Sequence, residues 1–152
     1  MDNNTDNKHI KLNPVDYEPE RLNRFLVRFP FEVGLQEWWM SKFKKPSYNF
    51  KTKTWGGRME FSMRAVFSSD YENWHPYMKD SEVIKNFERY NELNYEYVDF
   101  EELDPTGKVI SKVRYSNPKF ETIRFDEYDY GNDGIKGYTL EMSFDDMIEI
   151  DC

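Results

Sequence analysis

The last third of the chain alternates apolar and polar side chains in three consecutive segments. The alternation runs over residues 109–115, 122–126 and 138–145. Successive side chains of a β-strand point to opposite faces of a sheet, so a period of two predicts half-buried strands. The sequence Asp104-Pro105-Thr106-Gly107 precedes the first segment and places Pro and Gly where a β-turn favours them. The pattern therefore predicts three short strands in a row, entered through a turn.

The first two thirds of the chain predict further strands and one helix. Residues 24–33 alternate like a strand, but Pro30 restricts this segment to a sheet edge or a bulge. Residues 59–67 predict another strand, and a further one is expected to begin near Tyr95. Residues 81–93 place apolar side chains on one stripe at helical spacing, with charged residues opposite. One helix among many strands indicates a mainly β fold.

The segment from residue 35 to residue 58 has no clean period, and we expect a long loop or a protruding hairpin there. It carries five lysines together with many aromatic side chains. Two interpretations stay open: a surface loop with aromatics tucked beneath it, or a contact with another subunit, because interfaces favour aromatic anchors. The residues predicted for such a contact are Trp38, Trp39, Phe43 and Trp55.

The composition fits one folded domain. A chain of 152 residues is one domain on length alone and is long enough to bury a core. Mean hydropathy is low, at -0.92, but 18% of the residues are aromatic, which is unlike a disordered chain. Residues 1–20 are rich in Asn and Asp, and we expect a flexible arm that either stays disordered or orders against a neighbouring subunit. Residues 21–152 are expected to form the β domain.

Charge and hydropathy exclude several classes of function. A net charge of -8 disfavours a protein that grips nucleic acid, but it allows DNA to slide past. No apolar run approaches the ~20 residues that span a bilayer, so no membrane partner is expected. The N-terminus lacks the pattern of a signal peptide, and the single cysteine, Cys152, forms no internal disulfide. These features favour a cytosolic origin.

The sequence offers no convincing catalytic or metal site. Its two histidines, His9 and His75, have no partner at a zinc-ligand spacing, and Ser68-Ser69 beside His75 lacks an orienting third group. The acidic stretch 126–134 suggests calcium, but Leu140 stands where an EF-hand loop that starts at Asp129 needs glutamate. A solvated hairpin turn is the better interpretation. We therefore expect no catalytic residues, no metal and no cofactor.

Four segments resemble the tail tube proteins of contractile-tailed phages, whose fold is shared by the type VI secretion tube protein. They are Asn23–Val27, Leu103–Ile110, Ile123–Tyr130 and Tyr138–Asp145. The resemblance implies a mainly β domain of two packed antiparallel sheets with one flanking helix. It also implies that copies form a hexameric ring with a shared β-barrel, and that rings stack into a hollow tube.

The resemblance further implies a structural protein of the virion tail that is assembled in the host cytoplasm and guides DNA during ejection. The expected partners are other copies of the chain, tail sheath proteins and baseplate proteins, while DNA passes without specific binding. A baseplate protein that initiates the tube is an alternative with the same fold. Two rival classes remain: a small β-barrel that binds a hydrophobic ligand, and an enzyme.

A channel for DNA is expected to be polar with a net negative balance, because like charge keeps the phosphate backbone from adhering. The polar faces of the last strands supply the candidates for the lining. These are Glu121, Asp126, Glu141 and Asp145.

Overall fold

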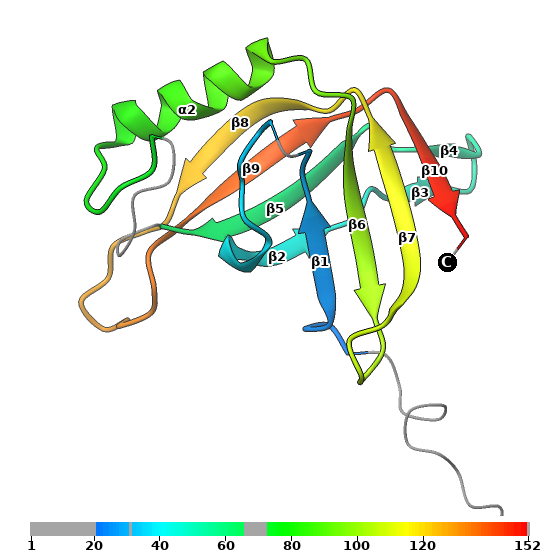
Figure 1. Cartoon of the computed structure of the whole chain (residues 1–152), viewed down its shortest axis with the longest axis horizontal. Helices are drawn as coiled ribbons and strands as arrows, with labels where there is room; N and C mark the ends of the chain where they lie inside the picture. Colours follow the sequence, from blue (N-terminus) through cyan, green and yellow to red (C-terminus); the bar gives the residue numbers. More distant parts are fainter. Residues whose placement is uncertain (1–20, 31, 66–72, 152) are drawn as a thin grey trace, which may run out of the picture.

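The computed structural model describes residues 21–30, 32–65 and 73–151, so the expected arm over residues 1–20 lies outside the described residues. Two four-stranded antiparallel sheets pack face to face, and one helix flanks them (Figure 1). Sheet A has the order β1 (Phe25–Arg28), β6 (Tyr97–Leu103), β7 (Val109–Ser116), β10 (Asp146–Ile150). Sheet B has the order β2 (Met40–Lys44), β5 (Arg58–Arg64), β9 (Gly137–Ser143), β8 (Lys119–Phe125). The predicted class, mainly β with two packed antiparallel sheets and one flanking helix, is confirmed.

Two smaller elements and the helix complete the described fold. A two-stranded hairpin of β3 (Tyr48–Asn49) and β4 (Thr54–Trp55) leaves sheet B between β2 and β5. The short 3-10 helix η1 (Glu37–Trp39) leads into β2, and α2 (Asp80–Glu92) lies against β8 (Figure 1). The hairpin confirms the expectation of a protrusion in the segment 35–58.

The core lies between the two sheets and is rich in aromatic rings. Sheet A contributes side chains such as Val27 and Tyr115, and sheet B contributes Phe61 and Leu140, all almost fully buried. The helix covers the end of this core, with the ring of Phe87 centred 4.8 Å from the ring of Phe120 on β8. Burial of one face of each sheet accounts for the alternation in the sequence.

The predicted strands of the last third are confirmed as β7, β8 and β9. Between β6 and β7 the predicted turn is also present: Asp104 Oδ1 accepts hydrogen bonds from the backbone N–H of Thr106 at 2.8 Å and of Lys108 at 2.9 Å. The Thr106 hydroxyl donates to the same oxygen, and this bond is the largest cause of the lowered pKa of Asp104. Gly107 has φ of 88°, which a glycine adopts without steric cost.

Three elements differ from the sequence-based prediction. The first strand ends at Arg28 rather than Val33, because Pro30 cannot donate a ladder hydrogen bond. The start of the segment 35–58 showed no strand period in the sequence but contains β2, whose bulge places both Met40 and Phe43 toward the core and removes the period of two. A fourth strand, β10, follows β9 and pairs with β7.

The two adjacent tryptophans at η1 have different environments. Trp39 is 1% exposed and its ring centre lies 5.8 Å from that of Trp74 in the core, whereas Trp38 is 58% exposed. Trp39 therefore stabilises the protomer itself, and only Trp38 of this pair is available to a partner.

We predict that Trp39→Ala lowers the free energy of unfolding by about 3–5 kcal/mol, because it leaves a large cavity in the core. Trp38→Ala is the matched control and is expected to cost about 1 kcal/mol or less, since it removes an exposed ring and one edge contact. Guanidinium unfolding of both variants measures the difference. Equal costs would contradict the assignment of Trp39 to the core.

Candidate functional site: surfaces for assembly

The outer face of sheet B is polar along its whole length. On the central strands β5 and β9, every side chain that alternates with the core is charged, hydroxyl-bearing or absent. These positions are Arg58, Glu60, Ser62, Arg64, Gly137, Thr139, Glu141 and Ser143. Cross-strand pairs order this face, including Ser62 to Thr139 at 2.9 Å. A sheet face without apolar side chains is suited to contact with water rather than to a packed interface.

Ion pairs cross the strands of this outer face. Arg58 contacts Glu121 at 2.8 Å and Glu141 at 3.9 Å, and Arg124 contacts Glu60 at 3.2 Å. The hydrogen bond from Arg58 is the largest cause of the lowered pKa of Glu121, and the Ser143 hydroxyl adds to it.

Cations outnumber carboxylates on this face. The cations are Lys42, Lys44, Arg58, Arg64 and Arg124, and the carboxylates are Glu60, Glu121 and Glu141. The net negative balance expected for a channel lining is not a property of this face.

The four residues predicted to line a channel do not form one surface. Glu121 and Glu141 lie on the outer face of sheet B. Asp126 lies just after β8 and accepts a hydrogen bond from the Gly137 N–H at 2.8 Å. Asp145 lies between β9 and β10 and accepts from the Asn117 amide at 3.2 Å. Their role in a lining stays a prediction, and the structure brings only the first two together.

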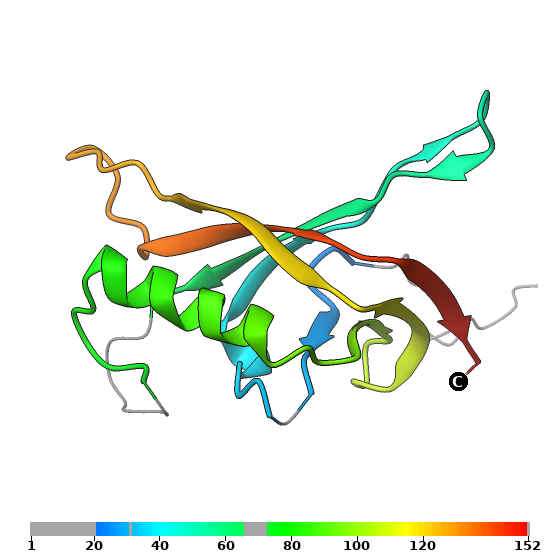
Figure 2. The same ribbon diagram turned by 90° about the horizontal axis from the view of Figure 1, so that it is seen from above.

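The β3–β4 hairpin projects from the body of the protein (Figure 2). It carries an exposed aromatic cluster. The ring centre of Tyr48 lies 5.2 Å from that of Phe50 and 5.1 Å from that of Trp55. Phe50 is 85% exposed. At the tip, Asn49 Oδ1 accepts hydrogen bonds from two backbone N–H groups, those of Lys51 and Thr52. The hairpin is thus an ordered arm whose apolar rings have no partner layer in the described protomer.

The four predicted contact residues divide into two groups. Trp38 and Trp55 are exposed and stay candidates for a contact between subunits. Trp39 is a core residue, and Phe43 is half-buried with its ring stacked 4.4 Å from that of Phe100. Phe50 is one of the aromatic residues that the sequence places in this segment, but its position at a hairpin tip follows only from the pairing of β3 with β4.

Sheet A presents a network of charges on its outer face that the sequence did not reveal. Asp99 and Glu101 are 3% and 2% exposed. Arg114 donates two hydrogen bonds to Asp99, at 2.8 and 2.9 Å. Arg28 donates to Glu101 at 2.8 Å, and Lys112 lies 3.3 Å from the same carboxylate. These bonds raise the pKa of both Arg28 and Arg114, and cover both buried carboxylates.

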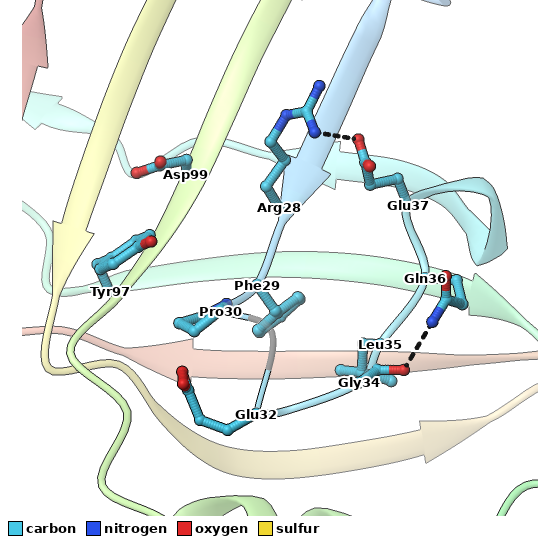
Figure 3. A pocket seen from close by; sticks show the side chains of 10 residues that line it. All are labelled: Arg28, Phe29, Pro30, Glu32, Gly34, Leu35, Gln36, Glu37, Tyr97 and Asp99. Carbon is cyan, nitrogen blue, oxygen red and sulfur yellow. Dashed lines mark hydrogen bonds and ion pairs between the residues drawn. The ribbon is translucent and has the colours of Figure 1, made fainter. Parts of the chain in front are cut away.

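A cavity of about 590 Å³ opens beside this network, between β1, β6 and the loop before η1 (Figure 3). Arg28 bridges from Glu101 to Glu37 at its rim, the latter contact being 2.9 Å. Among the described residues no three His, Cys, Asp or Glu side chains could hold a metal ion together. His75 contacts Glu82 at 3.5 Å. Ser68 and Ser69, which the sequence offered as nucleophiles beside His75, lie outside the described residues. The charged groups at the rim of the cavity are paired with one another.

Comparisons with known proteins find no matching family model and no match among curated proteins. Among solved structures, the tube-terminating cap of the anti-feeding prophage aligns with a TM-score of 0.58 and 13% identity, covering 95% of this chain and 97% of that one. A chain of the PVC sheath–tube complex, an extracellular contractile injection system, aligns at 0.55 with 14% identity, covering 91% and 96%. The chain has the tail-tube fold. Hcp1 from Flavobacterium johnsoniae shares this fold, with a TM-score of 0.51, 7% identity and coverage of 85% and 99%.

These three alignments cover between 85% and 95% of this chain and between 96% and 99% of the solved chains. In the part of the chain that is described, no helix is long and apolar enough to cross a membrane.

We predict that Arg114→Met lowers the free energy of unfolding by about 3 kcal/mol, because it leaves the buried Asp99 carboxylate without its bidentate partner. Arg124→Met is the matched control: it breaks the exposed pair with Glu60 and is expected to cost less than about 1 kcal/mol. Urea unfolding at neutral pH measures both values. A cost for Arg114→Met no larger than that of the control would show that the network on sheet A adds nothing to stability.

Proposed function

We propose that the chain is a structural subunit of the hollow tube of a contractile tail or injection system. The observation that carries the proposal is the tail-tube fold over the length of the chain, combined with an open sheet whose outer face is polar throughout. No catalytic function is proposed.

The edges of sheet B support a ring. Within the described protomer, β2 and β8 each pair with one strand only, so the outer edge of each faces no further strand. Such edges promote pairing with another chain, and closure of a barrel removes them. Joining β2 of one copy to β8 of the next extends sheet B, and the heterologous contact closes when the rotation completes a ring. We propose hexameric rings with a shared barrel, as the resemblance implies.

We propose that the outer face of sheet B lines the channel, because a wholly polar face stays hydrated. DNA during ejection is the cargo suggested by the resemblance, and passage without specific binding is part of the proposal. Lys42 and Lys44 on this face would attract phosphates, so the proposed passage of DNA rests on the hydrated lining and not on like-charge repulsion.

The proposed place of the chain is the tail of a virion or a related injection particle, built in the host cytoplasm. Sheath proteins and baseplate proteins are the proposed partners outside the ring. A tube initiator in the baseplate is the second candidate, because the anti-feeding prophage baseplate also contains a chain with this fold, at a TM-score of 0.51 and 15% identity.

We predict that the purified chain forms rings of uniform diameter, or tubes built from them, at high protein concentration. Negative-stain electron microscopy and sedimentation velocity measure the assembly.

Phe50→Ala is expected to leave the protomer folded and to reduce assembly, because it removes an 85% exposed aromatic ring. A parent protein that stays monomeric at all concentrations, with and without a crowding agent, would contradict a tube subunit.

We predict that charge changes on the proposed lining alter retention of DNA by assembled tubes in opposite directions. Lys42→Glu with Lys44→Glu is expected to weaken binding of short duplex DNA, and Glu121→Lys with Glu141→Lys to strengthen it, because each lysine adds a phosphate contact. Gel filtration of tubes with labelled DNA, at low and high salt, measures the retention. Equal retention by both variants would place this face away from the channel.

A further inference from the structure

Two protrusions extend from sheet B (Figure 2), and their sequences carry opposite charges. The first, called the basic hairpin, comprises residues 42–58 and contains Lys42, Lys44, Lys45, Lys51, Lys53 and Arg58 with no Asp or Glu. The second, called the acidic loop, comprises residues 126–135 between β8 and β9 and contains Asp126, Glu127, Asp129 and Asp133 with no Lys or Arg. Positive charge is therefore concentrated on the basic hairpin and negative charge on the acidic loop.

The register of sheet B places these arms at opposite ends of the same strands. Arg58, at the start of β5, is paired with Ser143 at the end of β9, next to the basic hairpin. Arg64, at the end of β5, is paired with Gly137, which directly follows the acidic loop and Lys136. A second copy shifted along the strand direction would thus bring its basic hairpin toward the acidic loop of the first.

Both arms also carry exposed apolar side chains. The basic hairpin presents Phe50 and Trp55, and the acidic loop presents Tyr128, Tyr130 and Ile135, all at least half exposed. Monomers seldom expose several large apolar side chains together, and aromatic rings commonly anchor interfaces. The two arms are complementary in charge and share the capacity to bury rings.

The acidic loop is held by an internal hydrogen bond and lies beside an ammonium group of its own chain. Asp129 Oδ1 accepts a hydrogen bond from the Gly131 N–H at 2.8 Å, which holds the loop in an Asx turn. The Lys136 ammonium lies 5.7 Å from the ring centre of Tyr128 and 5.9 Å from that of Tyr138. A lysine beside these tyrosines is therefore accommodated within the protomer, and a lysine from another copy would meet the remaining carboxylates and the ring of Tyr130.

We propose that the basic hairpin of one copy binds the acidic loop of a second copy, head to tail along the strand direction. The contact is heterologous and uses the two ends of the sheet, so it repeats from copy to copy and sets the polarity of a stack. It is separate from the edge contact of β2 with β8 that closes a ring. The role in stacking rings rests on the proposed tube function, whereas the pairwise contact itself does not.

Charge reversal with rescue tests the contact. Lys51→Glu with Lys53→Glu, and separately Glu127→Lys with Asp133→Lys, are each expected to weaken association between copies at least about tenfold, because like charges then face each other. The four-fold variant that combines both pairs is expected to recover association. Lys85→Glu with Lys108→Glu changes the net charge by the same amount and sign as the Lys51 and Lys53 pair, at exposed sites outside both arms, and it is expected to behave as the parent. Sedimentation velocity and tube length in electron micrographs measure association.

Three results would overturn the proposal: unchanged association in both reversed pairs, no recovery in the combined variant, or an equal loss in the control. The unfolding curve of every variant is measured as well. A curve close to that of the parent shows that a loss of association does not come from misfolding.

Cross-linking separates this contact from the proposed function. In a Cys152→Ser background, a mixture of Phe50→Cys and Ile135→Cys proteins is expected to give a disulfide-linked dimer in severalfold higher yield than Phe50→Cys mixed with Leu93→Cys, which places the thiol on an exposed helix end. The dimer without tubes would support the contact and contradict the tube. Tubes from the parent without the dimer would support the tube and overturn the contact.

Discussion

The packing of aromatic rings around Phe120 joins the two sheets and the helix into one core. Phe120 lies on β8, and rings from five other places in the chain surround it with centres between 4.8 and 6.4 Å away. These rings are Phe29, Phe61, Phe87, Tyr90 and Tyr95. Because each ring buries a large area and meets its neighbours at defined angles, this cluster fixes how α2 closes the wedge between the sheets. The packing of this cluster therefore sets which face of each sheet is buried and which face is turned outward.

Once one face of each sheet is buried, the two outer faces differ in character. Sheet A covers Asp99 and Glu101 with arginine and lysine side chains from the neighbouring strands β1 and β7, which pairs both buried carboxylates with cations. Sheet B presents charged and hydroxyl-bearing side chains that are partly or fully exposed, with ion pairs across its strands. The first kind of surface suits a stable scaffold or a docking face, and the second suits contact with water. The same sandwich therefore supports different surroundings on its two sides.

Sheet B can be contacted by other copies at its two edges and at the two ends of its strands. The free edges of β2 and β8 point sideways from the sheet, whereas the β3–β4 hairpin and the β8–β9 loop lie at the two ends of its strands. Edge contacts and end contacts act along different axes, so they can be formed independently of each other. A subunit with both kinds of contact can extend in a plane and along an axis, which is the geometric requirement for a tube.

The sequence by itself determined most of the strands and the helix, because alternation and helical spacing are local patterns that burial of one face imposes. It also determined the Asp104 turn, the charge of the two arms and the resemblance to the tail-tube family. It did not determine β2, because the bulge at Ser41 interrupts the alternation of apolar and polar side chains. It also did not determine that Trp38 is exposed and Trp39 is buried, because these adjacent residues on a 3-10 turn differ only in what packs on them. The tertiary structure decided those points, together with the pairing of Asp99 with Arg114 and the separation of Asp126 and Asp145 from Glu121. Each depends on contacts between residues that are distant in the chain, and such contacts leave no period in the sequence.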